Sequence, residues 1–357
     1  HFDPYLGVVA YVRVVDGILK PGMQVRMMAS GFDTEVSGVG IFAPEMRSTE
    51  TLVTGQVGFV HAAIKDISVC RVGDTLTQTD HLATQPLPGY KQIKPMVFCG
   101  LYPVDNDQFP DLREALSRLQ LNDAALSFEP ETSAALGFGF RCGFLGLLHS
   151  DIVQERLERE FNMELVATSP SVVYRVTLTD DSILLLDNPT RWPPGERISM
   201  IEEPYVSGTI ITPSDHVGAC MELCKERRCV FRSIEYTGVN RVVLSYDLPL
   251  GEILLDFFDS LKSRTRGYAS FDYEFLEYRQ GKMVKLDVLI NGEAVDALSF
   301  ITPHDLAYKR GKSLVTRLKE ILHRQMFEIR IQASIGSKVI AAERISAMRK
   351  NVLAKCY

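Results

Sequence analysis

The sequence has 357 residues, of which 46% are hydrophobic and 24% are charged, a composition typical of a soluble globular chain of two to four domains. No apolar run approaches the ~18–20 residues of a membrane span, and the first residues lack the basic and apolar regions of a signal peptide. Seven cysteines without a CxxC pair argue against a disulfide framework, and the absence of an initial Met suggests a piece of a longer protein.

Residues 1–83 consist of short strands separated by turns, which predicts a small closed β-barrel. Alternating apolar residues begin at Val8, and the pairs Asp16-Gly17 and Pro21-Gly22 mark the first turns. The following stretch, 84–89, is rich in Pro and Gly and predicts a linker.

Residues 91–178 change character and predict a split βαβ, or ferredoxin-like, domain with the order β-α-β-β-α-β. Asp111 is expected to cap the first helix, because apolar residues follow it at helical spacing. We expect a glycine-rich strand over 137–148, a second helix over 150–161 and a closing strand over 172–176.

Residues 201–280 repeat that order and predict a second ferredoxin-like domain. The pattern predicts strands over 205–211, 230–236, 241–246 and 271–278, and helices over 214–228 and 251–263. Between the two copies, residues 179–200 contain several prolines and predict an extended linker.

Residues 281–357 predict a small basic α+β domain, with a helix over 313–325, a strand over 327–335 and a last helix over 343–354. From His304 to Tyr357 there are twelve Lys and Arg against four Asp and Glu, a balance of +8. The other 303 residues hold 27 Lys and Arg against 41 Asp and Glu, a balance of −14. A basic end on an acidic chain predicts attraction to a polyanion such as RNA.

Two motifs superficially suggest a bound cofactor. The run Arg310-Gly311-Lys312-Ser313 resembles the end of a phosphate loop, but Leu306 stands where the loop requires its first glycine. His216, Cys220 and Cys224 share one side of a predicted helix and could ligate a metal. The two cysteines also fit the apolar face of that helix, which is the stronger interpretation.

The glycine- and phenylalanine-rich run from Gly139 to His149, followed by the charged run to Phe161, resembles the LepA family of translation factors. The first 83 residues are similar to the barrel domain that follows the GTPase domain in translational GTPases. Residues 201–280 are similar to the last ferredoxin-like domain of elongation factor G, and residues 351–357 match the end of the LepA-specific C-terminal domain.

The resemblance covers essentially the whole chain. It implies that residues 1–83 are domain II, 91–178 are domain III, 201–280 correspond to domain V of elongation factor G, and 281–357 are a truncated LepA-specific domain. It also implies that the family's N-terminal GTPase domain and extreme C-terminal tail lie outside this sequence, together with the GTP and Mg²⁺ sites. Within the chain we therefore expect no catalytic, cofactor-binding or metal-binding residue.

The resemblance further implies the ribosome- and tRNA-binding portion of a ribosome-dependent GTPase. Such a factor moves tRNAs backward by one codon or supports translational fidelity under stress. The implied partners are ribosomal RNA and A-site tRNA. The chain is expected to be monomeric and cytoplasmic, with peripheral association of the parent protein with the inner face of the cell membrane as a further expectation.

Ten basic residues near the C-terminus are the candidates for RNA contact: Lys309, Arg310, Lys312, Arg317, Arg324, Lys338, Arg344, Arg349, Lys350 and Lys355. Their apolar neighbours are expected to form a core, so most of these charges should project outward. A second set belongs to the family motif and is expected to have a structural or interdomain role: Gly139, Arg141, Gly143, Gly146 and His149.

Three other interpretations remain open: a BipA-type ribosome-associated GTPase, a free-standing RNA-binding scaffold and a metal-dependent enzyme. Elongation factor G itself is disfavoured, because it carries a long extra domain where only about twenty residues separate the two ferredoxin-like units here. The glycine- and phenylalanine-rich strand favours LepA over BipA.

Because the sequence contains no GxxxxGK[ST] phosphate loop, we predict that the purified chain hydrolyses no GTP, with or without ribosomes. Phosphate release should be measured on material that has been purified twice. Hydrolysis that follows the protein through the second purification would contradict the prediction.

Overall fold

The computed structural model of the chain describes residues 2–3, 6–62, 64, 70, 73–88, 95–123, 125–238, 240–254 and 256–348. The chain divides into two compact units. Unit 1 comprises residues 1–95, 110–128 and 149–163, and unit 2 comprises residues 96–109, 129–148 and 164–357. No helix among the described residues is long and apolar enough to cross a membrane.

Unit 1 contains the antiparallel strands of the N-terminal region. Its main sheet has the order β1-β2-β8-β5-β4-β9, with β6 paired to β5, and β3 and β7 form a separate pair. The strands are β1 Phe2–Asp3, β2 Gly7–Arg13, β3 Ile18–Leu19, β4 Gln24–Met27, β5 Asp33–Ala43, β6 Glu45–Thr49, β7 Leu52–Val53, β8 Val57–Ala62 and β9 Leu76–Gln78. Among the described residues the sheet does not close, so the predicted barrel is not confirmed.

The next region has the predicted order of helices and strands, although its closing strand is β13 and not the predicted segment 172–176. It comprises β10 Val97–Pro103, α1 Phe109–Gln120, β11 Ser127–Ser133, β12 Gly137–Phe144, α2 Leu147–Phe161 and β13 Leu165–Ala167. The sheet order β11-β12-β10-β13 places the first strand between the third and the fourth, as in a split βαβ unit. The cap prediction for Asp111 is wrong, because α1 begins at Phe109 and Asp111 lies in its first turn.

The second sheet of unit 2 has the same topology. Its elements are β17 Ile198–Pro213, α3 Val217–Glu226, β18 Val230–Tyr236, β19 Arg241–Pro249, α4 Leu250–Ile253, α5 Phe257–Arg264 and β20 Ser270–Gln280. Strand β17 lies between β20 and β19, and β18 pairs with the far side of β19. The predicted repeat of one supersecondary unit is therefore confirmed.

Two predicted segments near the junction of the sheets are corrected. The strand expected over 172–176 to close the first sheet is divided, because β14 Ser171–Val172 pairs with β10 whereas β15 Tyr174–Leu178 pairs with β17. The segment 179–200 is not an extended linker, since β16 Ile183–Leu186 forms a hairpin with β15. Burial explains both differences, because Val176 and Leu186 are fully buried in the core of the second sheet.

The helix predicted over 251–263 is divided in the structure. Asp256 has a left-handed backbone conformation, with φ at 54°, between α4 and α5. This left-handed conformation interrupts the right-handed helix. It is uncommon at Asp256, because the left-handed region is sterically unfavourable for a residue with a Cβ.

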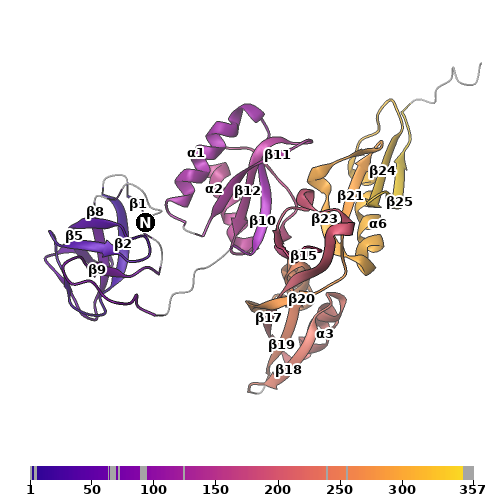
Figure 1. Cartoon of the computed structure of the whole chain (residues 1–357). Helices are drawn as coiled ribbons and strands as arrows, with labels where there is room; N and C mark the ends of the chain where they lie inside the picture. Colours follow the sequence, from indigo (N-terminus) through magenta and orange to yellow (C-terminus); the bar gives the residue numbers. More distant parts are fainter. Residues whose placement is uncertain are drawn as a thin grey trace, which may run out of the picture. The chain divides into compact units, whose positions relative to one another are not determined.

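The third sheet contains the C-terminal elements, β21 Met283–Ile290, β22 Glu293–Ala294, β23 Phe300–Pro303, α6 His304–Ile321, β24 Ile329–Ile335 and β25 Lys338–Ile345. The order is β22-β21-β24-β25, with β23 paired to β21, and α6 packs on one face (Figure 1). Helix α6 begins nine residues before the predicted start at 313, directly after Pro303, which occupies its N-cap. The helix predicted over 343–354 is wrong at 343–345, which lie in β25, and residues 349–354 lie outside the described residues.

Gly311, from the run that resembles a phosphate loop, has a packing role in the structure. It is buried inside α6, and a Cβ there would lie 3.1 Å from the Ala333 side chain and 3.2 Å from that of Leu286. The glycine therefore lets the helix approach the sheet closely, and its backbone N–H is in a helix interior, where it cannot wrap a phosphate.

Candidate functional site

The described basic candidates fall into two groups that differ in their ion pairs. Lys309, Arg317, Arg324 and Lys338 are exposed and make no ion pair within the described part of the chain. Arg310, Lys312 and Arg344 each face a carboxylate. Four of the seven are thus exposed without an ion pair, and the paired side chains of Lys312 and Arg344 are still 44% and 72% exposed. The remaining candidates lie outside the described residues: Arg349, Lys350 and Lys355.

The sequence analysis did not select two basic residues, Lys319 on α6 and Arg330 on β24. Lys319 lies 2.8 Å from Glu343, which also accepts a hydrogen bond from Lys312 at 2.5 Å. These two hydrogen bonds lower the pKa of Glu343 to about 2. Arg330 lies directly opposite Arg344 on neighbouring strands, and both side chains are exposed. The period-two pattern of 327–335 could have identified Arg330, since it places this residue on the polar face.

Arg310 belongs to a buried ionic cluster, which we define as Glu203, Arg228, Glu252 and Arg310. Arg228 donates to both oxygens of Glu203 at 2.8 and 2.9 Å and to Glu252 at 3.0 Å. Arg310 donates to the other oxygen of Glu252 at 2.5 Å. The Glu252 and Glu203 side chains are only 2% and 5% exposed. Burial alone would lower the pKa of Arg228, but its hydrogen bonds to the two glutamates raise it above the ordinary value.

The four residues of the buried ionic cluster come from four elements of unit 2. Glu203 lies on β17, Arg228 follows α3, Glu252 lies in α4 and Arg310 lies in α6. Arg310 also donates to the hydroxyl of Thr302 on β23 at 3.0 Å. The cluster thus connects the second sheet to the C-terminal sheet through charge-assisted hydrogen bonds. The guanidinium of Arg310 already has partners in this cluster, so a contact of Arg310 with RNA would compete with these hydrogen bonds.

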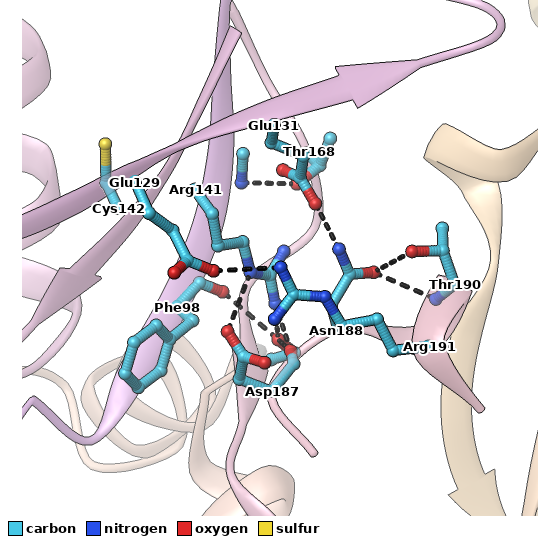
Figure 2. A network of polar contacts seen from close by, with 12 residues as sticks. Phe98, Glu129, Glu131, Arg141, Cys142, Thr168, Asp187, Asn188, Thr190 and Arg191 are labelled. Carbon is cyan, nitrogen blue, oxygen red and sulfur yellow. Dashed lines mark hydrogen bonds and ion pairs between the residues drawn. The ribbon is translucent and has the colours of Figure 1, made fainter. Parts of the chain in front are cut away.

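Arg141 forms a second network inside unit 2 (Figure 2). Its guanidinium donates to the carbonyl oxygen of Asp187 and, at 2.5 Å, to the hydroxyl of Ser171. Asn188 donates to Glu131 in the same network, and Arg191 donates to Glu129 at 3.1 Å. The loop after β16 is therefore attached to β11 and β12 by polar contacts that Figure 2 shows around Arg141.

The other family-motif residues have packing roles. A Cβ on Gly139 would collide with the ring of Tyr102, and one on Gly146 would lie 3.1 Å from the Tyr273 hydroxyl. Gly143 pairs with Phe98 across the first sheet of unit 2. In unit 1, the His149 ring lies 2.6 Å from Asp123. The structure therefore places these motif residues in contacts of the fold, and Arg141 at the centre of a network.

A cavity of about 650 Å³ lies among the three sheets of unit 2, with Tyr102, Arg141, Arg228, Asp296 and Arg317 among its lining residues. Asp296 ties this region together, since it accepts from Ser133 and from the backbone N–H of Ala134, both at 2.8 Å. Burial alone would raise the pKa of Asp296, but these hydrogen bonds lower it. Most of the charged side chains around the cavity are paired with one another.

The suggested metal ligands do not converge. Cys220 and Cys224 are buried in the core beneath α3, whereas the His216 ring stacks on Tyr268 at a centroid distance of 6.0 Å. No group of three His, Cys, Asp or Glu side chains suited to a metal ion occurs among the described residues.

Comparisons with known proteins match successive parts of the chain. Residues 7–77 match the family model of elongation factor Tu domain 2, residues 200–289 match that of the elongation factor G C-terminus, and residues 290–357 match that of the GTP-binding protein LepA C-terminus.

Curated relatives match over the full length of the chain. Elongation factor 4 from Geobacillus thermodenitrificans (strain NG80-2) is 57% identical over 100% of this chain and 58% of the relative. Elongation factor 4 from Anoxybacillus flavithermus (strain DSM 21510 / WK1) is 58% identical, over 100% of this chain and 59% of the relative. The chain thus spans less than two thirds of the length of these relatives. A crystal structure from Thermus thermophilus covers 78% of this chain and 54% of its own at a TM-score of 0.48 and 19% identity, a likeness too low to carry an argument.

The buried ionic cluster predicts that Glu252→Gln destabilises unit 2 by about 3 kcal/mol, because the change removes a buried carboxylate and leaves two half-buried arginines incompletely paired. Trp192 is the single tryptophan and packs against the core of the second sheet, so its fluorescence during urea unfolding measures the effect. Glu343→Gln is the matched control: its partners Lys312 and Lys319 are 44% and 45% exposed, and little change is expected. Equal unfolding midpoints for the two variants would contradict the prediction.

Proposed function

The chain belongs to the LepA (elongation factor 4) family of translation factors, and from this premise we propose that it is the ribosome- and tRNA-binding portion of a ribosome-dependent GTPase. Under this proposal the parent protein binds GTP and Mg²⁺ in a domain that this chain does not contain. It moves tRNAs backward by one codon and supports translational fidelity under stress. It acts in the cytoplasm and associates peripherally with the inner face of the cell membrane.

The domain division expected from the sequence is part of the proposal. It assigns a translation-factor barrel to 1–83, domain III to 91–178, a domain similar to domain V of elongation factor G to 201–280, and the LepA-specific domain to 281–357. The region between the two ferredoxin-like units holds the β15–β16 hairpin rather than an additional domain. That short connection supports the LepA assignment over an elongation factor G arrangement.

The observation that carries RNA binding is the charge of the C-terminal sheet. Arg330 and Arg344 face each other across β24 and β25, and like charges at such positions destabilise a sheet. Glu328 lies 4.0 Å from Arg344, at the limit of an ion pair, and both of these side chains are at least half exposed. A phosphate bound between the two guanidiniums would relieve their repulsion, because arginine matches phosphate with two parallel hydrogen bonds.

Further exposed cations add to the basic surface of this domain on α6, which covers the other face of the sheet, between α6 and β24, and at the start of β25. They are Lys309, Arg317, Arg324 and Lys338, which make no ion pair with any other residue the structure describes. An acidic chain with a balance of −14 outside this region repels RNA elsewhere. Attachment through this surface is therefore favoured, and contacts to phosphates position the RNA without reading its sequence.

The test is cosedimentation with ribosomes, and filter binding with tRNA, across a series of salt concentrations. We predict that Arg330→Ser with Arg344→Ser weakens binding and makes the salt slope shallower by about one unit for each phosphate that is no longer neutralised. Lys309→Ser with Arg317→Ser tests the helix in the same way. Neither pair touches the buried ionic cluster, so the fold should be retained.

The matched control replaces two exposed arginines that are distant in sequence from the C-terminal domain. It is Arg118→Ser with Arg159→Ser, whose side chains are 63% and 77% exposed in the wild-type chain. It changes the net charge equally, so a general electrostatic effect would weaken its binding as much as that of the other pairs. Affinities and salt slopes that are the same in all three variants would place the RNA contact elsewhere and exclude this surface.

A further inference from the structure

The end of helix α3 has the backbone geometry of a Schellman motif. The N–H of Cys229 donates to the carbonyl of Cys224 at 3.0 Å, and the N–H of Arg228 donates to that of Lys225 at 3.4 Å. Arg228 between them is left-handed, with φ at 57°. In this motif the residue two positions past the helix end contacts the residue three positions before it. Those two positions are held here by Cys229 and Cys224.

The two thiols lie at different depths. Cys224 lies on the buried face of α3 and is fully buried, whereas Cys229 is half-buried. The Cys229 thiol donates to the carbonyl of Arg227 at 3.6 Å. A hydrogen bond between the two thiols, together with burial, raises the pKa of Cys224. The pair therefore has one sulfur that a reagent can reach, that of Cys229, and a buried second sulfur, that of Cys224.

We propose that Cys224 and Cys229 form a reversible dithiol site that closes to a disulfide by exchange with a small-molecule disulfide such as oxidised glutathione. The inference is independent of RNA binding. The Cys229 thiolate attacks the reagent, forms a mixed disulfide and releases one glutathione thiol. Cys224 then loses its proton and attacks the Cys229 sulfur, and the second glutathione thiol leaves. The two cysteines lose two electrons, and the reagent is reduced to two thiols.

The remaining buried cysteines show why this pair is distinct. Cys99 and Cys142 face each other across β10 and β12, but they are only 2% and 0% exposed. Cys220 is also fully buried. Exchange requires access to a thiolate, so among these described cysteines only Cys224 and Cys229 combine facing positions, set by the backbone hydrogen bonds of the Schellman motif, with an entry point.

The site lies next to the buried ionic cluster, because Arg228 stands between the two cysteines in the chain. Its left-handed backbone directs the guanidinium that holds Glu203 and Glu252. A disulfide across the motif would fix that backbone conformation and restrict the unfolded chain. The oxidised protein should therefore unfold at a higher urea concentration than the reduced protein, as followed by Trp192 fluorescence.

The direct test incubates the reduced native chain with oxidised glutathione, blocks remaining thiols after denaturation and maps the tryptic peptides. Lys225, Arg227 and Arg228 separate the two cysteines, so trypsin places them on different peptides and a disulfide joins these covalently. We expect that linked pair in the wild-type chain, its loss on reduction, and no linkage between Cys99 and Cys142.

Two variants separate the roles of the sulfurs. Cys224→Ser should accumulate a stable glutathione adduct on Cys229, whereas Cys229→Ser should leave Cys224 unmodified. In the wild-type chain, whose folding is not in question, a lasting adduct on Cys229 beside a free Cys224 would overturn the proposal. So would absence of any modification, or a Cys99–Cys142 linkage that forms as fast.

Discussion

The arrangement of unit 2 depends on the pairing of four charged side chains that are largely removed from water. Glu203 and Glu252 are nearly fully buried, and a carboxylate in that environment is strongly unfavourable unless cations and hydrogen bonds compensate it. Arg228, which follows α3, and Arg310, on α6, supply that compensation. Because each carboxylate needs its arginine, the second and third sheets are constrained to one mutual position, which hydrophobic contact alone would specify less sharply.

That constraint also determines which basic residues can serve in binding. A guanidinium with buried partners must break charge-assisted hydrogen bonds before it can meet a phosphate. Arg310 is therefore committed to the fold, whereas Arg330 and Arg344 lie on the opposite face of the C-terminal sheet from α6 and repel each other. Charge along the sequence identifies the basic region, but pairing in three dimensions separates the structural cations from those available to RNA.

Local patterns in the sequence predicted the repeated β-α-β-β-α-β units and most of their strands, because helical and strand periodicities are short-range properties. They failed where a partner distant in sequence decides the outcome. Val176 looks like the end of one sheet but pairs with Ile201 of β17 in the next. Arg310 looked like a surface cation because its partner Glu252 lies 58 residues away. Gly311 resembles a phosphate-loop glycine only superficially, and its lack of a Cβ lets α6 pack closely against Ala333.

The most direct measurement of the central claim is a double-mutant cycle between Glu252→Gln and Arg310→Met, with urea unfolding followed by Trp192 fluorescence. If the two side chains stabilise each other across the sheets, the destabilisation of the double variant will be smaller than the sum of the two single effects. The expected coupling is of order 1–3 kcal/mol. Additive effects, with coupling indistinguishable from zero, would show that the buried ionic cluster does not hold the C-terminal sheet to its neighbour.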